Sequence, residues 1–500
     1  MIQPGQAPDQ TEVVAFLQGL AGEAPIETHI SAVFRGVDTV WKLKRAVRLP
    51  FVDFSRPDDR CRCLRRELEL NAPYAPGLYR DVVAVVRGPG GLAFGAEPAG
   101  AIGPVCAIGP ADAIDWVLRM ARVPEGDFLD RMTLTPALLD ATADAVAEMH
   151  AALPPVMVEH PVQRLRQVVL GNGRSALAAG LPPDAVRRWQ VGMLAAVEAH
   201  AALIAGRAAA GFVRRAHGDL HLGNLLLWHG RPAPFDALEF DEELATIDLG
   251  YDLAFLLMDL EHRASRAAAN RVLGRYVGRS GDAALVGLLP AVLSMRAMVR
   301  AHVEASRGLG GLDYLDIALA TLCPAPPVVV AVGGLMGTGK TTLARALAPE
   351  LGPAPGALVL RSDEVRKRLQ AVRPEVRLPP SAYDAVSHRR TDAALLAAVR
   401  DAAAGRHAVV VDATFLDPVL RGDVAAVART AGMPFVGLWL HAPQAELERR
   451  VAARLGDASD ATVAVLRGVA AVVPPADWHH VEATDAGATL QEARLALKEM

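Results

Sequence analysis

The stretch Gly334-Leu335-Met336-Gly337-Thr338-Gly339-Lys340-Thr341 decides the fold of the second half of the chain. It follows an apolar run from Val328 to Val332 and precedes a helical pattern from Leu343 to Leu351. A Gly-x4-Gly-Lys-Thr sequence between a strand and a helix is a phosphate-binding loop, in which backbone N–H groups surround phosphates at the helix N-terminus. We therefore predict an α/β domain with a parallel sheet and a nucleotide site at this loop.

The chemistry of the loop assigns roles to its residues. Lys340 is expected to bridge the outer phosphates, and the hydroxyl of Thr341 is expected to bind Mg²⁺. Together these assignments predict ATP and Mg²⁺ as the cofactors of this half. The predicted nucleotide-binding residues of the loop and its helix are Gly334, Gly337, Thr338, Gly339, Lys340, Thr341 and Thr342.

Acidic residues follow two later strands of the same half. Asp363 comes after the predicted strand 357–360, and Asp412 comes after the predicted strand 408–411. Strand carboxyl ends face the ligand crevice of an open parallel sheet, so Asp363 is a candidate base for a substrate hydroxyl. Asp412 is predicted to bind Mg²⁺ or, alternatively, a substrate hydroxyl. Arg454, beside a loop, is a candidate to bind the phosphoryl group of the nucleotide during transfer.

The first half carries a second constellation, His217-Gly218-Asp219-Leu220-His221-Leu222-Gly223-Asn224. The Asp-x4-Asn spacing is used in phosphoryl transfer, with the Asp as the base for the attacking hydroxyl and the Asn as a metal ligand. Asp236 follows a short apolar segment twelve residues later and suits a second Mg²⁺ ligand, because Mg²⁺ prefers hard oxygen donors. We predict Asp219 as catalytic and Asn224 and Asp236 as metal ligands.

A cation for the nucleotide phosphates is expected on the strand Val40-Trp41-Lys42-Leu43-Lys44. Side chains alternate along a strand, so Lys42 and Lys44 share a face, and both are candidates. Glu67, on the next predicted helix, is the first candidate to orient the lysine, with Glu69 as the alternative. The loop before this strand, Thr28 to Phe34, has no Gly-x-Gly sequence to cover the phosphates.

The chain divides at Cys323-Pro324-Ala325-Pro326-Pro327, because three prolines in four residues do not continue a helix. We predict a kinase domain at residues 1–322, a linker at 323–327 and a P-loop domain at 328–500. The first domain reads as a small lobe rich in strands followed by a helical lobe. Its expected elements are strands at 29–34 and 38–43 joined by a hairpin turn at 35–37, strands at 81–87 and 113–120, a helix at 60–71, and a long helical stretch at 290–322.

Composition excludes several classes of protein. Of the 500 residues, 52% are hydrophobic and the formal net charge is -4, so there is no basic excess for bulk nucleic acid or membrane surfaces. The four cysteines have no zinc-site spacing, and no uncharged apolar run is long enough to span a membrane. The first residues lack the basic and apolar regions of a signal peptide. A cytoplasmic protein with small-molecule partners is therefore expected.

The segment HGDLHLGNLLL, with PFDALEF and DLGYDLAFLLMDLE after it, resembles the aminoglycoside phosphotransferase and choline kinase group. The second half is similar to small P-loop kinases such as gluconate kinase and zeta toxin. The resemblance implies a role in substrate binding for Arg366, which follows Asp363. Both halves in this order resemble the fused bacterial family labelled bifunctional aminoglycoside phosphotransferase/ATP-binding protein. The implied fold is an α+β bilobal protein-kinase-like domain followed by a P-loop NTPase domain.

Three functions remain open at this level. The first is a two-headed phosphotransferase in which each half moves the γ-phosphoryl of Mg-ATP to a hydroxyl of a small molecule. The second is a regulatory pair in which one half is a nucleotide sensor or a toxin-like kinase restrained by the other. The third is an ATPase in the P-loop half. For the first half, aminoglycosides are disfavoured as substrates, because these polycations need clustered carboxylates. Glu304, Asp313 and Asp316 are the main candidates for such carboxylates, but a solvated helix would carry similar acids.

Overall fold

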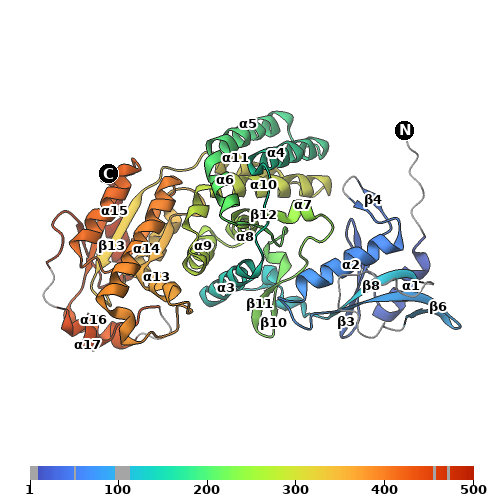
Figure 1. Cartoon of the computed structure of the whole chain (residues 1–500), viewed down its shortest axis with the longest axis horizontal. Helices are drawn as coiled ribbons and strands as arrows, with labels where there is room; N and C mark the ends of the chain where they lie inside the picture. The colour runs from blue at the N-terminus through green and yellow to red at the C-terminus, as the bar shows by residue number, and fades with distance from the viewer. Residues whose placement is uncertain (1–8, 50–51, 96–112, 454–457, 470–472, 500) are drawn as a thin grey trace. The chain divides into compact units, whose positions relative to one another are not determined.

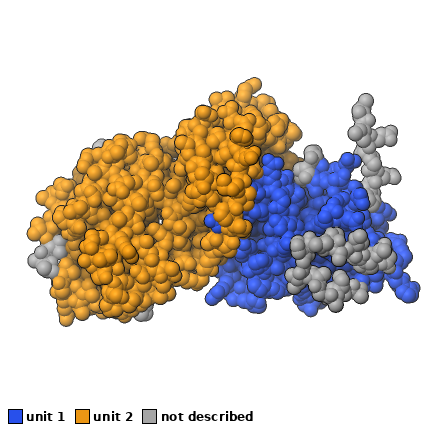
Figure 2. Space-filling view, viewed as in Figure 1, with its two compact units in different colours: residues 1–133, 214–247 blue, residues 134–213, 248–500 orange. Residues whose placement is uncertain are grey.

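The computed structural model describes residues 9–49, 52–95, 113–453, 458–469 and 473–499. The chain forms two compact units (Figure 2). Unit 1 comprises residues 1–133 and 214–247, and unit 2 comprises residues 134–213 and 248–500. The chain passes between the units three times: between residues 133 and 134, within β9 (Val213–Arg215) and within β12 (Thr246–Asp248). The linker proposed at 323–327 lies inside unit 2, and the division into domains at that segment stays a prediction.

Unit 1 is built on an antiparallel sheet of six strands in the order β1-β2-β3-β8-β6-β7. The predicted hairpin is present, because β2 and β3 pair with Val33 opposite Lys42 and Phe34 opposite Trp41. Helix α2 packs against β6 and β8 through buried side chains that include Cys61 and Leu64 (Figure 1). The elements of unit 1 are α1 (Thr11–Ala21), β1 (Ile26–Glu27), β2 (Ser31–Arg35), β3 (Thr39–Lys44), β4 (Arg48–Leu49), β5 (Val52–Asp53), α2 (Pro57–Asn71), β6 (Tyr79–Gly88), β7 (Gly91–Phe94), β8 (Ala113–Ala121), β10 (Leu225–Trp228), β11 (Arg231–Pro234) and α7 (Glu242–Ala245).

The first part of unit 2 is helical. The helical stretch predicted over 290–322 consists of two helices, α10 (Leu289–Ser306) and α11 (Leu312–Thr321). Gly311 has φ +93°, and a Cβ at this position would lie 2.3 Å from the carbonyl oxygen of Ala301, so only glycine fits the turn. The other helices here are α3 (Pro136–Ala152), α4 (Pro161–Ala178), α5 (Pro183–Ala199), α6 (Ala201–Ala209), α8 (Leu249–Arg263) and α9 (Arg266–Ser280).

The second part of unit 2 is a parallel sheet of five strands in the order β14-β15-β13-β16-β17. The apolar run at Val328 to Val332 forms the buried central strand β13, as predicted, and β17 was not anticipated. The elements, several of which are labelled in Figure 1, are β13 (Val329–Gly334), α12 (Lys340–Leu347), β14 (Leu358–Arg361), α13 (Ser362–Leu369), α14 (Ala385–Ala404), β15 (Val409–Asp412), α15 (Pro418–Thr430), β16 (Phe435–His441), α16 (Gln444–Ala452), α17 (Val463–Gly468), β17 (His479–Glu482) and α18 (Ala486–Lys498).

This crossover order places the phosphate-binding loop at the centre of the sheet. The loop leaves β13, whose neighbours are β15 on one side and β16 on the other. All pairings are parallel, so the carboxyl ends of β13, β14 and β15 lie at one edge. Ligands of open parallel sheets bind at that edge, which is where Asp363 and Asp412 stand. The predicted fold class is confirmed.

Among the described residues, no single helix is both long and apolar enough to cross a membrane. Helices α5 and α6 satisfy the length and composition criteria only when they are taken together, and a bend of 59° separates them.

A buried histidine beneath the parallel sheet predicts acid-sensitive stability. His407 is 1% exposed, its Nε2 lies 3.0 Å from the carbonyl oxygen of Gly356, and its buried Nδ1 has no partner among the described residues. Burial lowers the pKa of His407 to about 4, although the bond to Gly356 acts in the opposite direction. Between about pH 6.5 and about pH 4, the unfolded chain therefore binds a proton at this histidine more readily than the folded chain does. The free energy of unfolding falls by about 3 kcal/mol as the pH falls through that window.

We expect the variant His407→Gln to lose this pH dependence, because its amide is uncharged throughout. Urea unfolding of the wild type and the variant at pH 7.5 and pH 4.5 measures the difference. Equal losses of unfolding free energy in both proteins would contradict the assignment.

Candidate active sites

The catalytic loop of unit 1 brings its two predicted residues into contact. The amide Nδ2 of Asn224 donates to the backbone oxygen of Asp219 at 2.9 Å and to its Oδ2 at 3.1 Å. Asn224 is buried, whereas the Asp219 side chain is 45% exposed and so can meet a substrate. The loop therefore presents one accessible carboxylate, held in place by a buried amide.

Asp236 follows the hairpin of β10 and β11. It adopts φ +58°, a left-handed conformation, and its N–H donates to the hydroxyl of Tyr79 at 2.9 Å. The preceding residue, Phe235, donates its N–H to the backbone oxygen of Asn224 at 3.1 Å. The bond from Phe235 to Asn224 holds the loops of the two predicted metal ligands, Asn224 and Asp236, next to each other. His217 also bonds this segment, through Nε2 and the oxygen of Phe235 at 2.9 Å, and so packs the loop.

The lysine strand supplies the cation of this site. Lys42 Nζ lies 2.7 Å from Glu67 Oε1 and 2.5 Å from Asp236 Oδ1. Although burial acts to raise the pKa of Asp236, the charge of Lys42 lowers it to about 2, so the carboxylate is ionised. The alternative Glu69 instead pairs with Arg66 and is mostly exposed. The structure thus places Lys42, Glu67 and Asp236 together, from three segments distant in sequence.

Lys44 lies on the same face of β3, as the alternation predicted, but it is deeper. It is 1% exposed and is bonded to Glu67 Oε2 at 3.0 Å and to Glu239 Oε1 at 2.5 Å. Glu239 was missed at the level of sequence, although it lies only three positions after Asp236, within the segment PFDALEF. The available signal was an acid within the apolar stretch Ala237-Leu238-Glu239-Phe240.

The oxygen donors of unit 1 fit the Mg²⁺ of Mg-ATP. The described residues contain no group of three or more His, Cys, Asp or Glu that would hold a metal ion by itself. When nucleotide phosphates and water provide the other ligands, Mg²⁺ needs only a few protein oxygens, such as those of one carboxylate and one amide. Asp236 is ionised and 40% exposed, which suits that role.

The phosphate-binding loop in unit 2 depends on its glycines. A Cβ on Gly334 would lie 2.4 Å from the oxygen of Leu440, and one on Gly337 would lie 2.8 Å from the oxygen of Leu447. Gly339 caps α12 with φ +89°. These positions require the absence of a side chain, so the backbone can follow the curvature that phosphate binding needs.

The polar side chains of the loop turn toward its own backbone. Lys340 Nζ donates to the oxygen of Leu335 at 2.9 Å, and Thr338 Oγ1 donates to the same oxygen at 2.8 Å. Thr342 is exposed on the first turn of α12. Lys340 therefore lies over the loop, within the space where phosphates are predicted.

Thr341, in the first turn of α12, meets Asp412, the last residue of β15. The hydroxyl of Thr341 donates to Asp412 Oδ2 at 2.5 Å, and Arg361 Nε donates to the same oxygen at 3.3 Å. A hydroxyl and a carboxylate side by side at the phosphate loop fit the Mg²⁺ of Mg-ATP. Arg361 was not singled out from the sequence, where it is simply the last residue of β14.

The predicted acceptor residues lie on α13. Asp363 is in the first turn of this helix, and its charge contributes, after burial and Asp460, to raising the pKa of Tyr383. Arg366 is 6% exposed and bonds the oxygen of Ala382 at 3.1 Å and His388 Nδ1 at 3.1 Å. Arg366 is thus held against the segment after the helix. Arg454 lies outside the described residues.

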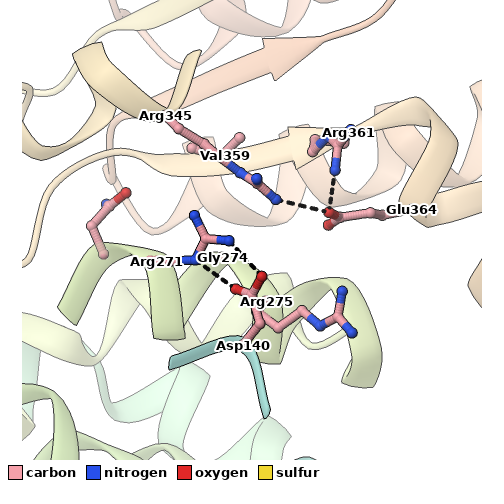
Figure 3. Close-up of a pocket in the computed structure, with 9 residues that line it drawn as sticks. Asp140, Arg271, Gly274, Arg275, Arg345, Val359, Arg361 and Glu364 are labelled. Atoms are coloured by element: carbon pink, nitrogen blue, oxygen red, sulfur yellow. Dashed lines mark hydrogen bonds and ion pairs between the residues drawn. The ribbon is translucent and has the colours of Figure 1, made fainter. Parts of the chain in front are cut away.

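A small pocket lies next to this second site, between α9 and the start of α13 (Figure 3). Arg361 Nη1 donates to Glu364 Oε1 at 2.7 Å, and Arg345 lies 3.6 Å from the same oxygen. On the α9 side Arg271 pairs with Asp140. Because Arg361 also contacts Asp412, the pocket adjoins the predicted Mg²⁺ ligands.

Two family models match the two halves of the chain separately. A family model described as "Phosphotransferase enzyme family" matches residues 102–285. A model described as "AAA domain" matches residues 329–476. Uncharacterized proteins of Mycobacterium tuberculosis and Mycobacterium bovis are 30% identical to the chain over 480 residues, covering 90% of the chain and 90% of each relative.

Solved structures also align with one half or the other. A gluconokinase from Sinorhizobium meliloti has 19% identity and a TM-score of 0.24, covering 35% of this chain and 93% of its own. A choline kinase from Cryptosporidium parvum has 10% identity and a TM-score of 0.40, covering 63% of this chain and 94% of its own. Likeness at these scores is not evidence of shared function, whereas the mycobacterial relatives span both halves.

Proposed function

Because this chain belongs to the fused family that joins an aminoglycoside phosphotransferase-like domain to a P-loop kinase-like domain, we propose that it is an ATP-dependent phosphotransferase with two nucleotide sites. Each half moves the γ-phosphoryl of Mg-ATP to a hydroxyl of a small molecule. The observation that carries the proposal is the contact of Lys42 with both Glu67 and Asp236. A cation held between an orienting acid and a metal-binding acid is the arrangement that phosphoryl transfer needs.

In the first half, Asp219 takes the proton of the acceptor hydroxyl as its oxygen bonds to the γ-phosphorus and ADP leaves. Lys42 holds the phosphates, and Glu67 orients Lys42. Asn224 and Asp236 hold Mg²⁺. When bound, Mg²⁺ neutralises the charge that develops on the phosphate oxygens. The 45% exposure of the Asp219 side chain supports its assignment as the base.

In the second half, the backbone of Gly334, Gly337, Thr338 and Gly339 binds phosphate oxygens, and Lys340 neutralises them. Thr341 and Asp412 hold Mg²⁺, and Thr342 and Arg454 complete the nucleotide site. Asp363 takes the proton of the acceptor hydroxyl, and Arg366 binds the acceptor. The Thr341–Asp412 contact supports this arrangement.

The acceptor of the first half is a small hydroxylated molecule rather than an aminoglycoside. Recognition of a polycation needs acids that are available to it. Of the three candidate acids, Glu304 pairs with Arg300 at 3.0 Å, Asp313 lies 3.6 Å from His262 Nε2, and Asp316 is exposed, so they do not form a cluster of available carboxylates. A cytoplasmic location belongs to the proposal: use of ATP suits it, and so does the lack of a disulfide at the three cysteines that the structure describes.

The proposal is tested by transfer of label from γ-labelled ATP into a metabolite extract, with products separated by mass. Wild type, Asp219→Ala and Lys340→Ala are compared side by side. We expect each variant to lose a different phosphorylated product, since each disables one site. If one variant yields every wild-type product, that half is a sensor or scaffold and the two-headed proposal fails.

A variant at the second acceptor base separates a kinase from an ATPase. We expect Asp363→Asn to lower transfer by the second half at least about 100-fold, because it removes the general base, while ATP hydrolysis by that half is retained. The exposed Asp423 on α15 provides the matched control Asp423→Asn, for which no change is expected. Equal loss of transfer and hydrolysis in Asp363→Asn would instead favour an ATPase.

A further inference from the structure

Two buried charges of the first site have no role in the chemistry proposed above. Lys44 and Glu239 are bonded at 2.5 Å, and their side chains are 1% and 4% exposed. Lys44 also lies 3.0 Å from Glu67, whose side chain is fully buried. At this depth Lys44 does not reach a nucleotide. An ion pair removed this far from water is costly unless its geometry and bonds compensate, so its presence calls for an explanation.

The pair completes the coordination of Glu67. One carboxylate oxygen of Glu67 bonds Lys42 at 2.7 Å, and the other bonds Lys44 at 3.0 Å. Lys44 is in turn held by Glu239, which also accepts from the thiol of Cys63 at 3.4 Å. Although burial acts to lower the pKa of Lys44, Glu67 and Glu239 raise it above its ordinary value, so Lys44 stays charged.

We propose that Lys44 and Glu239 form a positioning pair that fixes the carboxylate of Glu67, and through it the direction in which Lys42 meets the nucleotide phosphates. The inference rests on the proposed function of this site. Without Glu239, Lys44 keeps Glu67 as its one carboxylate partner among the described residues and competes for it with Lys42. Without Lys44, one oxygen of Glu67 is buried with no cation, and the carboxylate is free to rotate away from Lys42. Of the two candidate lysines, Lys42 therefore contacts phosphate and Lys44 acts through Glu67.

The test measures Mg-ATP binding by calorimetry in the background variant Lys340→Ala, which leaves the first site as the one that binds nucleotide. The main variant is Lys44→Met with Glu239→Gln. It removes both charges together, which avoids the destabilisation caused by one unpaired buried charge. We expect the Kd for Mg-ATP to rise about tenfold, as for a lost hydrogen bond to a charged group, with little change in melting temperature.

A matched control separates positioning from stability. Arg60 and Asp115 form another buried ion pair of unit 1, at 2.8 Å. Replacing them as Arg60→Met with Asp115→Asn is expected to leave the Kd within about twofold of the background, since no hydrogen bond or ion pair joins either side chain to Glu67 in the described part of the chain. An unchanged Kd in the Lys44/Glu239 variant, or an equal rise in the control, overturns the positioning role.

Two further variants keep the outcome decisive. If the main variant does not fold, Glu239→Asp keeps the charge but withdraws the carboxylate, and a Kd rise of about threefold is expected; no rise overturns the role. Asp236→Asn tests the site itself. If Asp236→Asn binds Mg-ATP as tightly as the background, or the background binds none, the proposed function of the first site fails, and the positioning role fails with it.

Discussion

Lys340→Ala is expected to lower phosphoryl transfer by the second half of the chain by about 10³–10⁵-fold, the effect of removing a cation from the transferring phosphoryl group. Lys340 is the first residue of α12, and its Nζ lies 2.9 Å from the oxygen of Leu335 in the same loop. The side chain is thus already folded over the loop where phosphates are proposed to bind. We expect its ammonium to neutralise the phosphate charge that the backbone N–H groups leave uncompensated.

The measurement is the rate of appearance of the phosphorylated product that depends on the second half. Lys498, exposed at the end of α18, provides the control Lys498→Ala in the same domain, for which no change is expected. The melting temperature should stay close to that of the wild type, because the Lys340 contact is a local one. Retention of full transfer by Lys340→Ala would remove the loop from the proposed chemistry.

The second large effect is expected at Asp219. Asp219→Asn should lower transfer by the first half about 10²–10⁴-fold, because an amide does not take the proton of the acceptor hydroxyl. Asn224 donates to the backbone oxygen of Asp219, and that bond does not depend on the Asp219 side chain. The loop should therefore keep its shape, and binding of Mg-ATP should change little.

Product formation by the first half, measured beside the Kd for Mg-ATP, checks this expectation. Asp58→Asn, at an exposed position on α2, is the control. Loss of ATP binding together with transfer would show that Asp219 supports the loop instead of acting as the base. Unchanged transfer would show that another group takes the proton.

Local signals predicted much of the fold. The hairpin of β2 and β3, the central strand β13 and the strand-loop-helix around Gly334 were predicted because each depends on neighbours in sequence. Such features follow from side-chain alternation, β-branched runs and glycines with special backbone angles. The helical stretch predicted over 290–322 divides into α10 and α11 for a local reason too, since Gly311 lies where a Cβ would meet the oxygen of Ala301.

The candidate sites were predicted only in part, because their geometry depends on long-range packing. Lys42 and Asp236 are 194 positions apart, and the sequence left Lys42 and Lys44 as equal candidates. Packing of α2 and of the segment after β11 places Glu67 and Asp236 against Lys42, and buries Lys44 against Glu239.

The sequence by itself determined which residue types stand in the two phosphate-binding and acid-base motifs, because each motif is contiguous and needs its residues at fixed spacing. Tertiary structure alone decided how these motifs are completed. The segment PFDALEF does not show what Glu239 contacts, and Arg361 is one arginine among many until the pairing of β14 with β15 brings it to Asp412. Buried charges must find partners wherever the fold provides them, and spacing along the chain does not encode which partner that will be.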